Sequence, residues 1–358
     1  MINLLKNTRQ NLIGENKTSK YLQYAFGEII LVVIGILIAV QLNNLNEQRQ
    51  KEKTFKINLE QIISDLKLDL LQVNEAIDFY SQKDSLIKLV LSNQVTKEMY
   101  KENRNLRSLI TNYSPFKPDK TGFDALLRNI DDIPDKYTSV INVLEQIHSD
   151  IQNDLQISES VLLNSIQKVL DNWTNNFDWY STSILGSPIK EISEKELDYL
   201  LNDPIYKNYV TNYLSSSKEN LIYFLQKYRQ ESLNALIMIR KNEKKNPDEI
   251  LNELKTFMSP LQPVYMKPCL TEIKIAFTPP DWNYYSVFII KNDFKETVKI
   301  YPYYVDGHMD KNKFLTIEPE GLTAIFDSQD YTYLVVKESE ECLGTFKTPE
   351  KDCLFVIN

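Results

Sequence analysis

Glycine, histidine and cysteine are all scarce in this chain of 358 residues, which has 8 glycines, 2 histidines and 3 cysteines. So few cysteines exclude a disulfide scaffold, and their spacing does not fit a metal site. The sequence has no G-x-S-x-G, P-loop, HExxH or CxxC motif. Carboxylates are abundant but form no recognisable acid–base pair. We therefore expect a protein that is not an enzyme and that holds no cofactor and no metal.

An excess of basic residues is also missing. The chain has 41 lysines and arginines against 49 aspartates and glutamates, a net charge of −8. Because a nucleic-acid-binding protein presents a basic face, nucleic acid is not an expected partner. The hydrophobic fraction of 42% and the charged fraction of 25% are those of a folded protein.

The three cysteines are Cys269, Cys342 and Cys353. In an oxidising compartment, Cys342 and Cys353 would be able to form one bridge. Free thiols on the surface or in the core are the other interpretation, and the sequence leaves both open.

One long apolar run near the amino end is the strongest feature that the chain does have. Ala25 to Leu42 supplies 18 mostly apolar residues, and Ile29 to Val40 has no polar side chain. A helix that crosses a bilayer needs about 20 such residues, whereas a soluble helix would show a polar face. No small-x-small cleavage site follows the run. We predict an uncleaved transmembrane helix over residues 24–42, preceded by a basic amphipathic segment over residues 1–23.

Glu28, Gly35 and Ala39 fall on one stripe of this helix. Gly35 and Ala39 form a small-xxx-small motif, which lets two helix backbones approach closely, and an acid inside a membrane is usually paired. We predict a packing face for a second copy of the chain or for a partner membrane protein. In the alternative interpretation, Glu28 lies at headgroup depth and reaches water.

The charges beside the span do not fix its orientation. The basic residues before and after it are Lys6, Arg9, Lys17 and Lys20, and Arg49, Lys51, Lys53 and Lys56. Four on each side give the positive-inside rule no asymmetry to use. A short tail is the easier segment to leave in the cytoplasm. We expect an inner-membrane protein with a cytoplasmic N-terminus and a periplasmic soluble part.

Residues 43–243 have helical periodicity and predict an antiparallel helical bundle. The apolar positions of the first helix are spaced close to 3.5 residues apart: Phe55, Leu59, Ile62, Leu66, Leu70, Val73, Ile77 and Tyr80. Such a coiled-coil-like seam pairs two chains or packs on later helices of the same chain, and we favour the second. Ser193 and Glu196 form a capping box, and a last long helix is expected from about Tyr206 to Arg240.

Residues 244–268 predict a proline-containing linker with a short helix that begins at Pro247 and is capped by Asn246. From residue 269 to 358 the period changes to two. Seven runs rich in aromatic and β-branched residues follow: 284–291, 297–304, 313–318, 322–327, 331–338, 343–347 and 353–357. They predict a small antiparallel β-sandwich. The expected fold class is thus a membrane-anchored α+β protein with several domains.

The segment KYLQYAFGEIILVVIGILIAVQLNNLNEQR resembles the opening of a large family of uncharacterised bacterial membrane proteins. The signature Y-A-x-G-E-I-x-L-V-x-x-G-I-x-I-A-x-Q matches from Tyr24 to Gln41, and FKPDKTGFDALL is a second mark. Leu45 stands where the family usually has tryptophan. The resemblance implies a single-pass anchor with a mostly helical soluble part, and it implies no known activity.

Residues 286–357 resemble the β-domain of the von Hippel–Lindau family. The shared frame is Asn292 after the first strand, the pair Asp306-Gly307, the turn from Pro319 to Gly321, and an aromatic strand before an acidic turn. That family binds a hydroxyproline peptide through Ser, His, Trp and Tyr. The matching positions here are Asp327 or Ser328, Tyr331, Tyr333 and Phe314. Because the His and Trp are absent, the resemblance implies a peptide-binding face but not hydroxyproline binding.

Tyrosines are denser in this region than a core needs. We predict a face that binds a peptide, formed by Tyr301, Tyr303, Phe314, Tyr331 and Tyr333. In the alternative interpretation, alternate tyrosines simply cover a small core.

These features together predict a non-enzymatic single-pass membrane protein whose soluble modules bind or sense a partner or ligand at the bacterial cell envelope. The alternative is an anchored accessory subunit of a membrane complex that faces the cytoplasm. The sequence names no ligand, oligomeric state or pathway.

Overall fold

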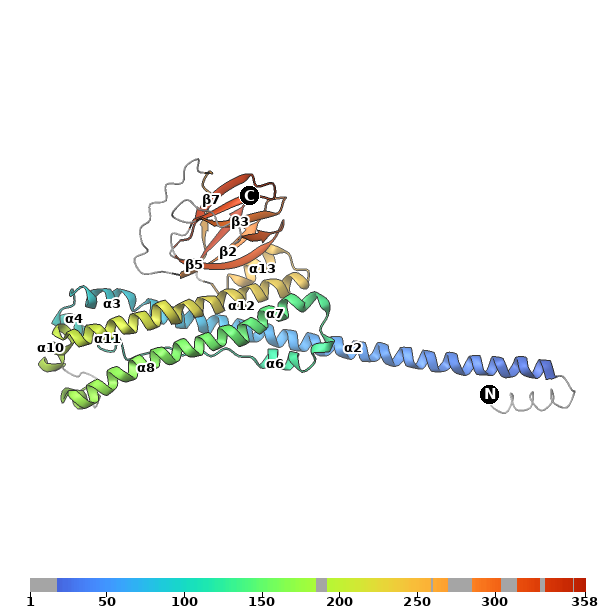
Figure 1. Cartoon of the computed structure of the whole chain (residues 1–358), viewed down its shortest axis with the longest axis horizontal. Coiled ribbons are helices and arrows are strands. Elements are labelled where there is room, and N and C mark those ends of the chain that lie inside the picture. Colours follow the sequence, from blue (N-terminus) through green and yellow to red (C-terminus); the bar gives the residue numbers. More distant parts are fainter. Residues whose placement is uncertain are drawn as a thin grey trace. The chain divides into compact units, whose positions relative to one another are not determined.

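The computed structural model describes residues 18–184, 192–258, 260–269, 285–303, 314–328, 332–349 and 351–358. The described chain is α+β, with helices up to residue 254 and two β-sheets from residue 262 onward (Figure 1). It divides into two units, residues 1–60 with 125–133 and residues 61–124 with 134–358.

The first unit consists mainly of the front part of α2 (Thr18–Ser81), a continuous helix of 64 residues. The 3₁₀ turn η1 (Ile130–Asp132) belongs to the same unit. Two contacts join α2 to the later residues of this unit. Lys51 Nζ lies 2.9 Å from Asp132 Oδ1, and Asn58 Nδ2 donates to the carbonyl of Ala125 at 3.3 Å.

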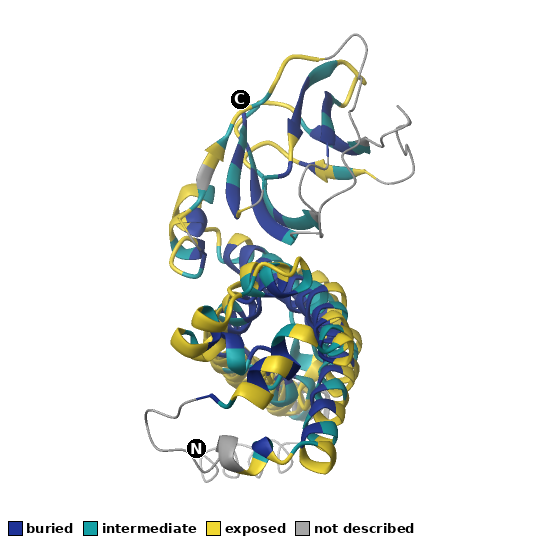
Figure 2. Cartoon of the chain, turned by 90° about the vertical axis from the view of Figure 1, so that its left-hand side faces the viewer, coloured by how far each residue is buried: buried dark blue, intermediate teal, exposed yellow. Residues whose placement is uncertain are grey.

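The second unit begins with the rest of α2 and contains these further helices: α3 (Asp84–Leu91), α4 (Lys97–Glu102), α5 (Arg104–Arg107), α6 (Thr121–Leu127, in part), η2 (Asp135–Tyr137), α7 (Thr138–Gln146), η3 (Ile147–Ile151), α8 (Gln152–Asn176), α9 (Trp179–Ile184), α10 (Glu194–Asn202), α11 (Pro204–Leu214), η4 (Ser215–Leu221), α12 (Ile222–Asn242) and α13 (Pro247–Leu254). Two long rods, α7–η3–α8 and α11–η4–α12, run side by side (Figure 1). In each rod the element labelled η is a π-helical turn inside an otherwise α-helical run. Figure 2 shows that the buried residues of these helices face one another.

The apolar seam of α2 is buried inside the single chain. Within the second unit its members are Ile62, Leu66, Leu70, Val73, Ile77 and Tyr80, all at most 8% exposed. The prediction that the seam packs within the chain is confirmed, because these side chains are already covered without a second copy.

Two predicted caps are confirmed. The side chain of Ser193 accepts from the backbone N–H of Glu196 at 3.1 Å, which starts α10. The side chain of Asn246 accepts from the N–H of Glu249 at 2.9 Å, and Pro247 opens α13. Each cap satisfies a backbone donor that the first helical turn leaves free.

The strands are β1 (Gln262–Val264), β2 (Tyr285–Asn292), β3 (Val298–Tyr303), β4 (Leu315–Ile317), β5 (Leu322–Ser328), β6 (Thr332–Lys337), β7 (Cys342–Lys347) and β8 (Cys353–Ile357). They form two sheets in the orders β1-β8-β2-β5 and β4-β3-β6-β7. All seven predicted runs become strands, β2 to β8. The expectation of an antiparallel sandwich is confirmed in part, because the other strand pairs are antiparallel but β8 pairs in parallel with both β1 and β2.

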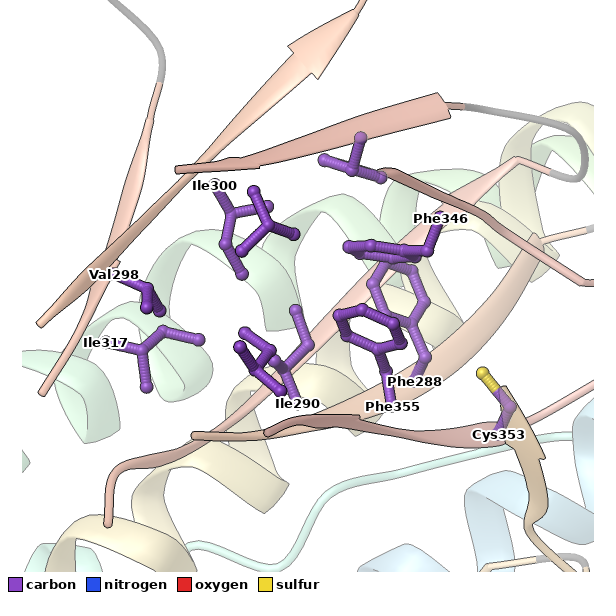
Figure 3. Packing of buried hydrophobic residues seen from close by; sticks show 11 residues of the cluster. Phe288, Ile290, Val298, Ile300, Ile317, Phe346, Cys353 and Phe355 are labelled. Carbon is purple, nitrogen blue, oxygen red and sulfur yellow. The ribbon is translucent and has the colours of Figure 1, made fainter. Parts of the chain in front are cut away.

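The core of the sandwich lies between the two sheets (Figure 3). Phe288 and Phe355 come from the first sheet, and Phe346 comes from the second. The rings of Phe346 and Phe355 are stacked with centroids 3.9 Å apart. Side chains from both sheets thus interdigitate in one apolar layer, which is the main source of stability for such a small domain.

The segment predicted to be a linker takes part in the sandwich. It supplies β1, and Lys267 pairs with Thr345 of β7, exchanging backbone hydrogen bonds of 2.8 and 2.9 Å. The segment therefore touches the first sheet at β8 and the second sheet at β7. Short pairing of this kind has no sequence signal, because three residues are too few to show a period of two.

Candidate functional site

The predicted membrane helix is exposed along its whole apolar length. Over this part of α2 the mean hydropathy is 2.5 and none of the 18-residue window is buried. By length and composition, this helix is able to cross a membrane. Glu28, Gly35 and Ala39 are all exposed, and a Cβ added to Gly35 would meet no atom within 4 Å. The predicted packing face thus stays a prediction, since no described residue of the chain packs on it.

Two members of the predicted peptide-binding face lie together on the second sheet. Val298 and Ile300 point into the core, so the alternation of β3 directs Lys299 and Tyr301 to the opposite face. The ring centroids of Tyr301 and Phe314 are 5.4 Å apart, and Phe314 is 48% exposed. Tyr301 is itself buried, at 4% exposed.

Charges frame this aromatic pair. Lys299 Nζ lies 5.7 Å from the ring centroid of Phe314 and 3.0 Å from Glu340 Oε1. The hydroxyl of Tyr301 donates to the same carboxylate oxygen at 3.3 Å. We call Lys299, Tyr301, Phe314 and Glu340 the β3 patch. It combines an exposed ring with a lysine and a carboxylate, which suits the backbone and side chains of a peptide.

Tyr333 is not part of that face. It lies in the core at 7% exposed, stacked on Phe346 with centroids 5.1 Å apart. This position fits the alternative interpretation, in which tyrosines cover the core, because Tyr333 and Val335 of β6 both point inward. Tyr331 and the side chain of Tyr303 lie outside the described residues.

One disulfide joins Cys269 to Cys342 with their Cα atoms 6.2 Å apart. Cys353 is a free, buried thiol. The bridge considered between Cys342 and Cys353 is wrong. The sulfur of Cys342 is bonded to Cys269 instead, and Cys353 lies in the core between the two sheets, at 1% exposed.

Side-chain amides of α12 bind the edge of the first sheet. Asn234 accepts from the N–H of Ala324 at 2.9 Å and donates to the carbonyl of Ala324 at 3.1 Å. One helical turn earlier, Gln230 accepts from the N–H of Phe326 at 3.1 Å. Because β5 is an edge strand, these two amides satisfy backbone groups that a neighbouring strand would otherwise bind. We call this contact the amide clamp.

A buried ion pair strengthens the same junction. The guanidinium of Arg229 binds both carboxylate oxygens of Asp352, with Nη1 3.1 Å from Oδ1 and Nη2 bound to Oδ2. Asp352 Oδ1 also accepts from the N–H of Val287 at 3.0 Å. Both charged residues are under 10% exposed. The helices and the sandwich are thus joined by directional polar contacts.

Buried acids of α2 hold the loop that the sequence marks as FKPDKTG. Asp65 Oδ2 accepts from the N–H of Gly122 at 2.8 Å, and Asp69 accepts from the N–H of Asp119 at 3.1 Å. Tyr228 donates its hydroxyl to Asp69, whose burial raises its pKa to about 6. The sequence did not single out Asp65 and Asp69, because they leave the apolar periodicity of α2 unbroken. Their only signal is their spacing of four residues beside the apolar seam.

Lys83 is a second buried ionisable group that the sequence did not reveal. Its Nζ donates to the carbonyls of Leu109 and Asn112 at 3.0 and 2.9 Å and to the hydroxyl of Tyr213 at 2.7 Å. Burial lowers the pKa of Lys83 to about 7. The lysine ties the end of α2 to the loop after α5 and to α11. Across the described parts of the chain, no group of three or more His, Cys, Asp or Glu side chains is arranged to hold a metal.

Residues 28–116 match the model of a family of unknown function (DUF6090). No curated protein and no solved structure matches the chain. The match confirms the resemblance of this region to an uncharacterised family. The anchor signature and the resemblance of the sandwich to the von Hippel–Lindau β-domain stay predictions.

Proposed function

We propose that this chain is a single-pass protein of the bacterial inner membrane whose soluble part lies in the periplasm and binds a partner or ligand there. The helix from Ala25 to Leu42 is the anchor, and the N-terminus is cytoplasmic. The helices of the second unit and the sandwich form the binding module. The role is one of binding, not catalysis.

The disulfide between Cys269 and Cys342 is the observation that carries the proposal. Disulfides form and persist in oxidising compartments such as the periplasm, and they are rare in the cytoplasm. The charges around the apolar helix do not choose between the two orientations, whereas the bridge favours the periplasmic one. The exposed apolar helix supports the anchor, because 18 residues of this kind are costly to leave in water.

The β3 patch supports a binding role. It places an exposed aromatic ring beside a lysine and a carboxylate on the outer face of the second sheet. The amide clamp and the ion pair between Arg229 and Asp352 connect the sandwich to α12, so a partner bound at the sandwich would be held rigidly to the helices.

Reporter fusions at residue 358 test the orientation. An alkaline phosphatase, which is active only after oxidation, is expected to be active there, and a cytoplasmic fluorescent reporter is expected to stay dark. The reverse result would assign the soluble part to the cytoplasm and favour an accessory subunit of a membrane complex.

Site-specific photo-crosslinking tests the binding role. A photoreactive phenylalanine at position 314 is expected to give a discrete adduct in intact cells. The matched control is position 265, since Tyr265 is also an exposed aromatic residue, at 79%. Equal adducts at both positions, or none at 314, would remove the β3 patch as the binding face.

A further inference from the structure

The segment between α13 and β2 lies along one edge of each sheet of the sandwich. Its strand β1 pairs in parallel with β8 of the first sheet, and Lys267 pairs with Thr345 of β7 in the second sheet. We call residues 262–269 the strap. Among the described strands, β7 is the last of its sheet, and β8 would be the last of the other sheet without β1. The strap therefore covers backbone groups that an edge strand would present to water or to another chain.

Side chains of the strap alternate between the core and the solvent. Val264 and Met266 pack against the core of the sandwich, whereas Tyr265 is 79% exposed and Lys267 is also exposed. Gly344 of β7 makes room for this packing. A Cβ at Gly344 would lie 2.7 Å from the carbonyl oxygen of Lys267 and 3.1 Å from Met266 Sδ. The strap thus lies close enough to β7 to exclude a side chain at this position.

Few non-covalent bonds hold the strap in place. Lys267 and Thr345 exchange two backbone hydrogen bonds of 2.8 and 2.9 Å. Strand β1 has three residues, and the middle one, Pro263, has no N–H to donate. Each hydrogen bond contributes little net free energy, because water offers similar bonds to a released strap. We therefore expect the strap to depend on the disulfide at its end, between Cys269 and Cys342.

The bridge is accessible from solution, unlike the third cysteine. Cys269 is exposed and Cys342 is half-buried, so a thiolate in solution has access to the bridge. An exposed disulfide is more readily reduced than one inside a core. Cys353 is 1% exposed, and burial raises the pKa of its thiol to about 12, so this thiol stays protonated and unreactive. Reduction of the bridge would thus leave two accessible thiols and one inert thiol.

We propose that the bridge between Cys269 and Cys342 is a site of reversible thiol–disulfide exchange with dithiols, and that its reduction releases the strap from β7. One thiolate of the dithiol attacks Cys269 Sγ, and Cys342 leaves as a thiolate. The second thiol of the dithiol then attacks the mixed disulfide and releases Cys269. The protein gains two electrons and two protons, and the dithiol becomes a disulfide. Without the covalent bond, the strap is free to move away and expose the edge of β7.

This proposal goes beyond the proposed binding role and does not rest on it. Its tests use purified protein that is oxidised or reduced by the experimenter, so they do not depend on the side of the membrane on which the sandwich lies. A cytoplasmic result from the reporter fusions would leave the proposal standing. A bridge that resists reduction would leave the proposed orientation standing.

The first experiment measures which thiols a dithiol opens in the folded chain. The full chain in lipid nanodiscs is oxidised, treated with dithiothreitol without denaturant, and labelled with iodoacetamide for mass analysis. We expect two labels per chain, at Cys269 and Cys342, with Cys353 labelled only after unfolding. Fewer than two labels before unfolding would overturn the proposal. Three labels would overturn it too, because the sandwich would then have unfolded.

Hydrogen exchange shows whether the strap leaves β7. We expect the amides of Lys267 and Thr345 to exchange at least tenfold faster in the reduced chain, while the amide of Ile289, fully buried in the central strand β2, keeps its rate. The double variant Cys269→Ser/Cys342→Ser should match the reduced chain. Unchanged rates at Lys267 and Thr345 would overturn the proposal, and so would faster exchange at Ile289, which would make the bridge purely structural.

Two glycine variants test the coupling between the strap and the bridge. If the bridge holds the strap on β7, the packing of the strap favours the bridge by the same factor. Gly344→Ala pushes the strap away and keeps every cysteine, so its ratio of reduced to bridged chain at equilibrium with dithiothreitol should rise at least tenfold. Gly35→Ala, whose Cβ meets no atom within 4 Å, is the matched control and should leave the ratio unchanged. An unchanged ratio in the folded Gly344→Ala protein would overturn the proposal.

Discussion

In the helical part of the second unit, buried polar residues bind segments that lie far apart in the sequence. Asp65 and Asp69 hold backbone amides more than 49 residues further along the chain, and Lys83 holds two carbonyls. A buried donor or acceptor that loses its partner costs roughly 1–3 kcal/mol. A single substitution at Asp65, Asp69 or Lys83 should therefore lower the free energy of unfolding, because it leaves the backbone partners of that side chain buried without a hydrogen bond.

Gly122 is the residue of the FKPDKTG loop that tolerates no side chain. A Cβ added there would lie 2.6 Å from the backbone nitrogen of Ile62 and 2.9 Å from Asp65 Oδ2. We expect Gly122→Ala to lower the free energy of unfolding by about 2 kcal/mol or more, because backbone atoms have no room to move. Denaturant unfolding of the full chain in nanodiscs measures this. Gly35→Ala, whose Cβ meets nothing, is the matched control, and an equal loss in both would contradict the prediction.

His148 should make the fold sensitive to mild acid. It stacks on Phe123 with centroids 4.9 Å apart, and burial lowers its pKa to about 4. Its folded pKa lies below the unfolded value of 6.5, so the stabilisation is present above pH 6.5 and is lost as the pH falls through 4. Between pH 7 and 5 this group should cost about 2 kcal/mol.

The measurement for His148 uses the variant His308→Gln, which leaves one imidazole in the chain. Its proton NMR signal should titrate with a midpoint near 4, against the charges of Asp119, Lys120 and Asp124 that surround it. In His148→Gln the acid loss between pH 7 and 5 should be smaller by about 2 kcal/mol. A midpoint near 6.5 would show that the imidazole is solvated.

At the scale of elements, the amide clamp replaces the missing neighbour of an edge strand. Helix α12 presents amide side chains at intervals of four residues, and alternate residues of β5 present their backbone groups outward. One helical turn from Gln230 to Asn234 therefore matches the two-residue step from Phe326 to Ala324 along β5. An uncovered edge would be a site for pairing with another chain.

The double variant Gln230→Leu/Asn234→Leu tests the amide clamp. It keeps side-chain size but removes all three hydrogen bonds to Ala324 and Phe326. We expect hydrogen exchange of the amides of Ala324 and Phe326 to accelerate at least tenfold, since each N–H loses its side-chain acceptor. Gln167→Leu, on the exposed face of α8, should leave both rates unchanged. Unchanged rates in the double variant would show that these amides are protected by other means.

Sequence patterns predict elements better than they predict how elements meet. The seven runs of alternating residues all become strands, because β-branched and aromatic side chains suit a pleated, half-buried surface. Which residues of β6 face the core is not predictable from the sequence, since Tyr333 and Leu334 are both apolar enough to be buried. Likewise, the partner of Cys342 is Cys269, 73 residues earlier in the chain, and a local sequence period does not show which distant segments meet.

At the scale of the whole molecule, the apolar helix and the disulfide are two separate observations that bear on the proposed localisation. The helix indicates a membrane from composition alone, and its flanking charges give no direction. The disulfide supports the oxidising side that we propose for the soluble part, because such bridges persist in oxidising compartments. The two observations rest on different residues, so a test of the disulfide in cells checks the proposed orientation independently of the apolar helix.

Counting free thiols in the full chain makes that test quantitative. With one bridge among three cysteines, the acid-quenched, denatured chain should react with one maleimide polymer per molecule, at Cys353. A strain without its periplasmic thiol oxidase should give three. The variant Cys269→Ser should give two in either strain, because Cys342 then has no partner. Three reactive thiols in the unmodified strain would assign the sandwich to the reducing side of the membrane, even if the helix remains embedded.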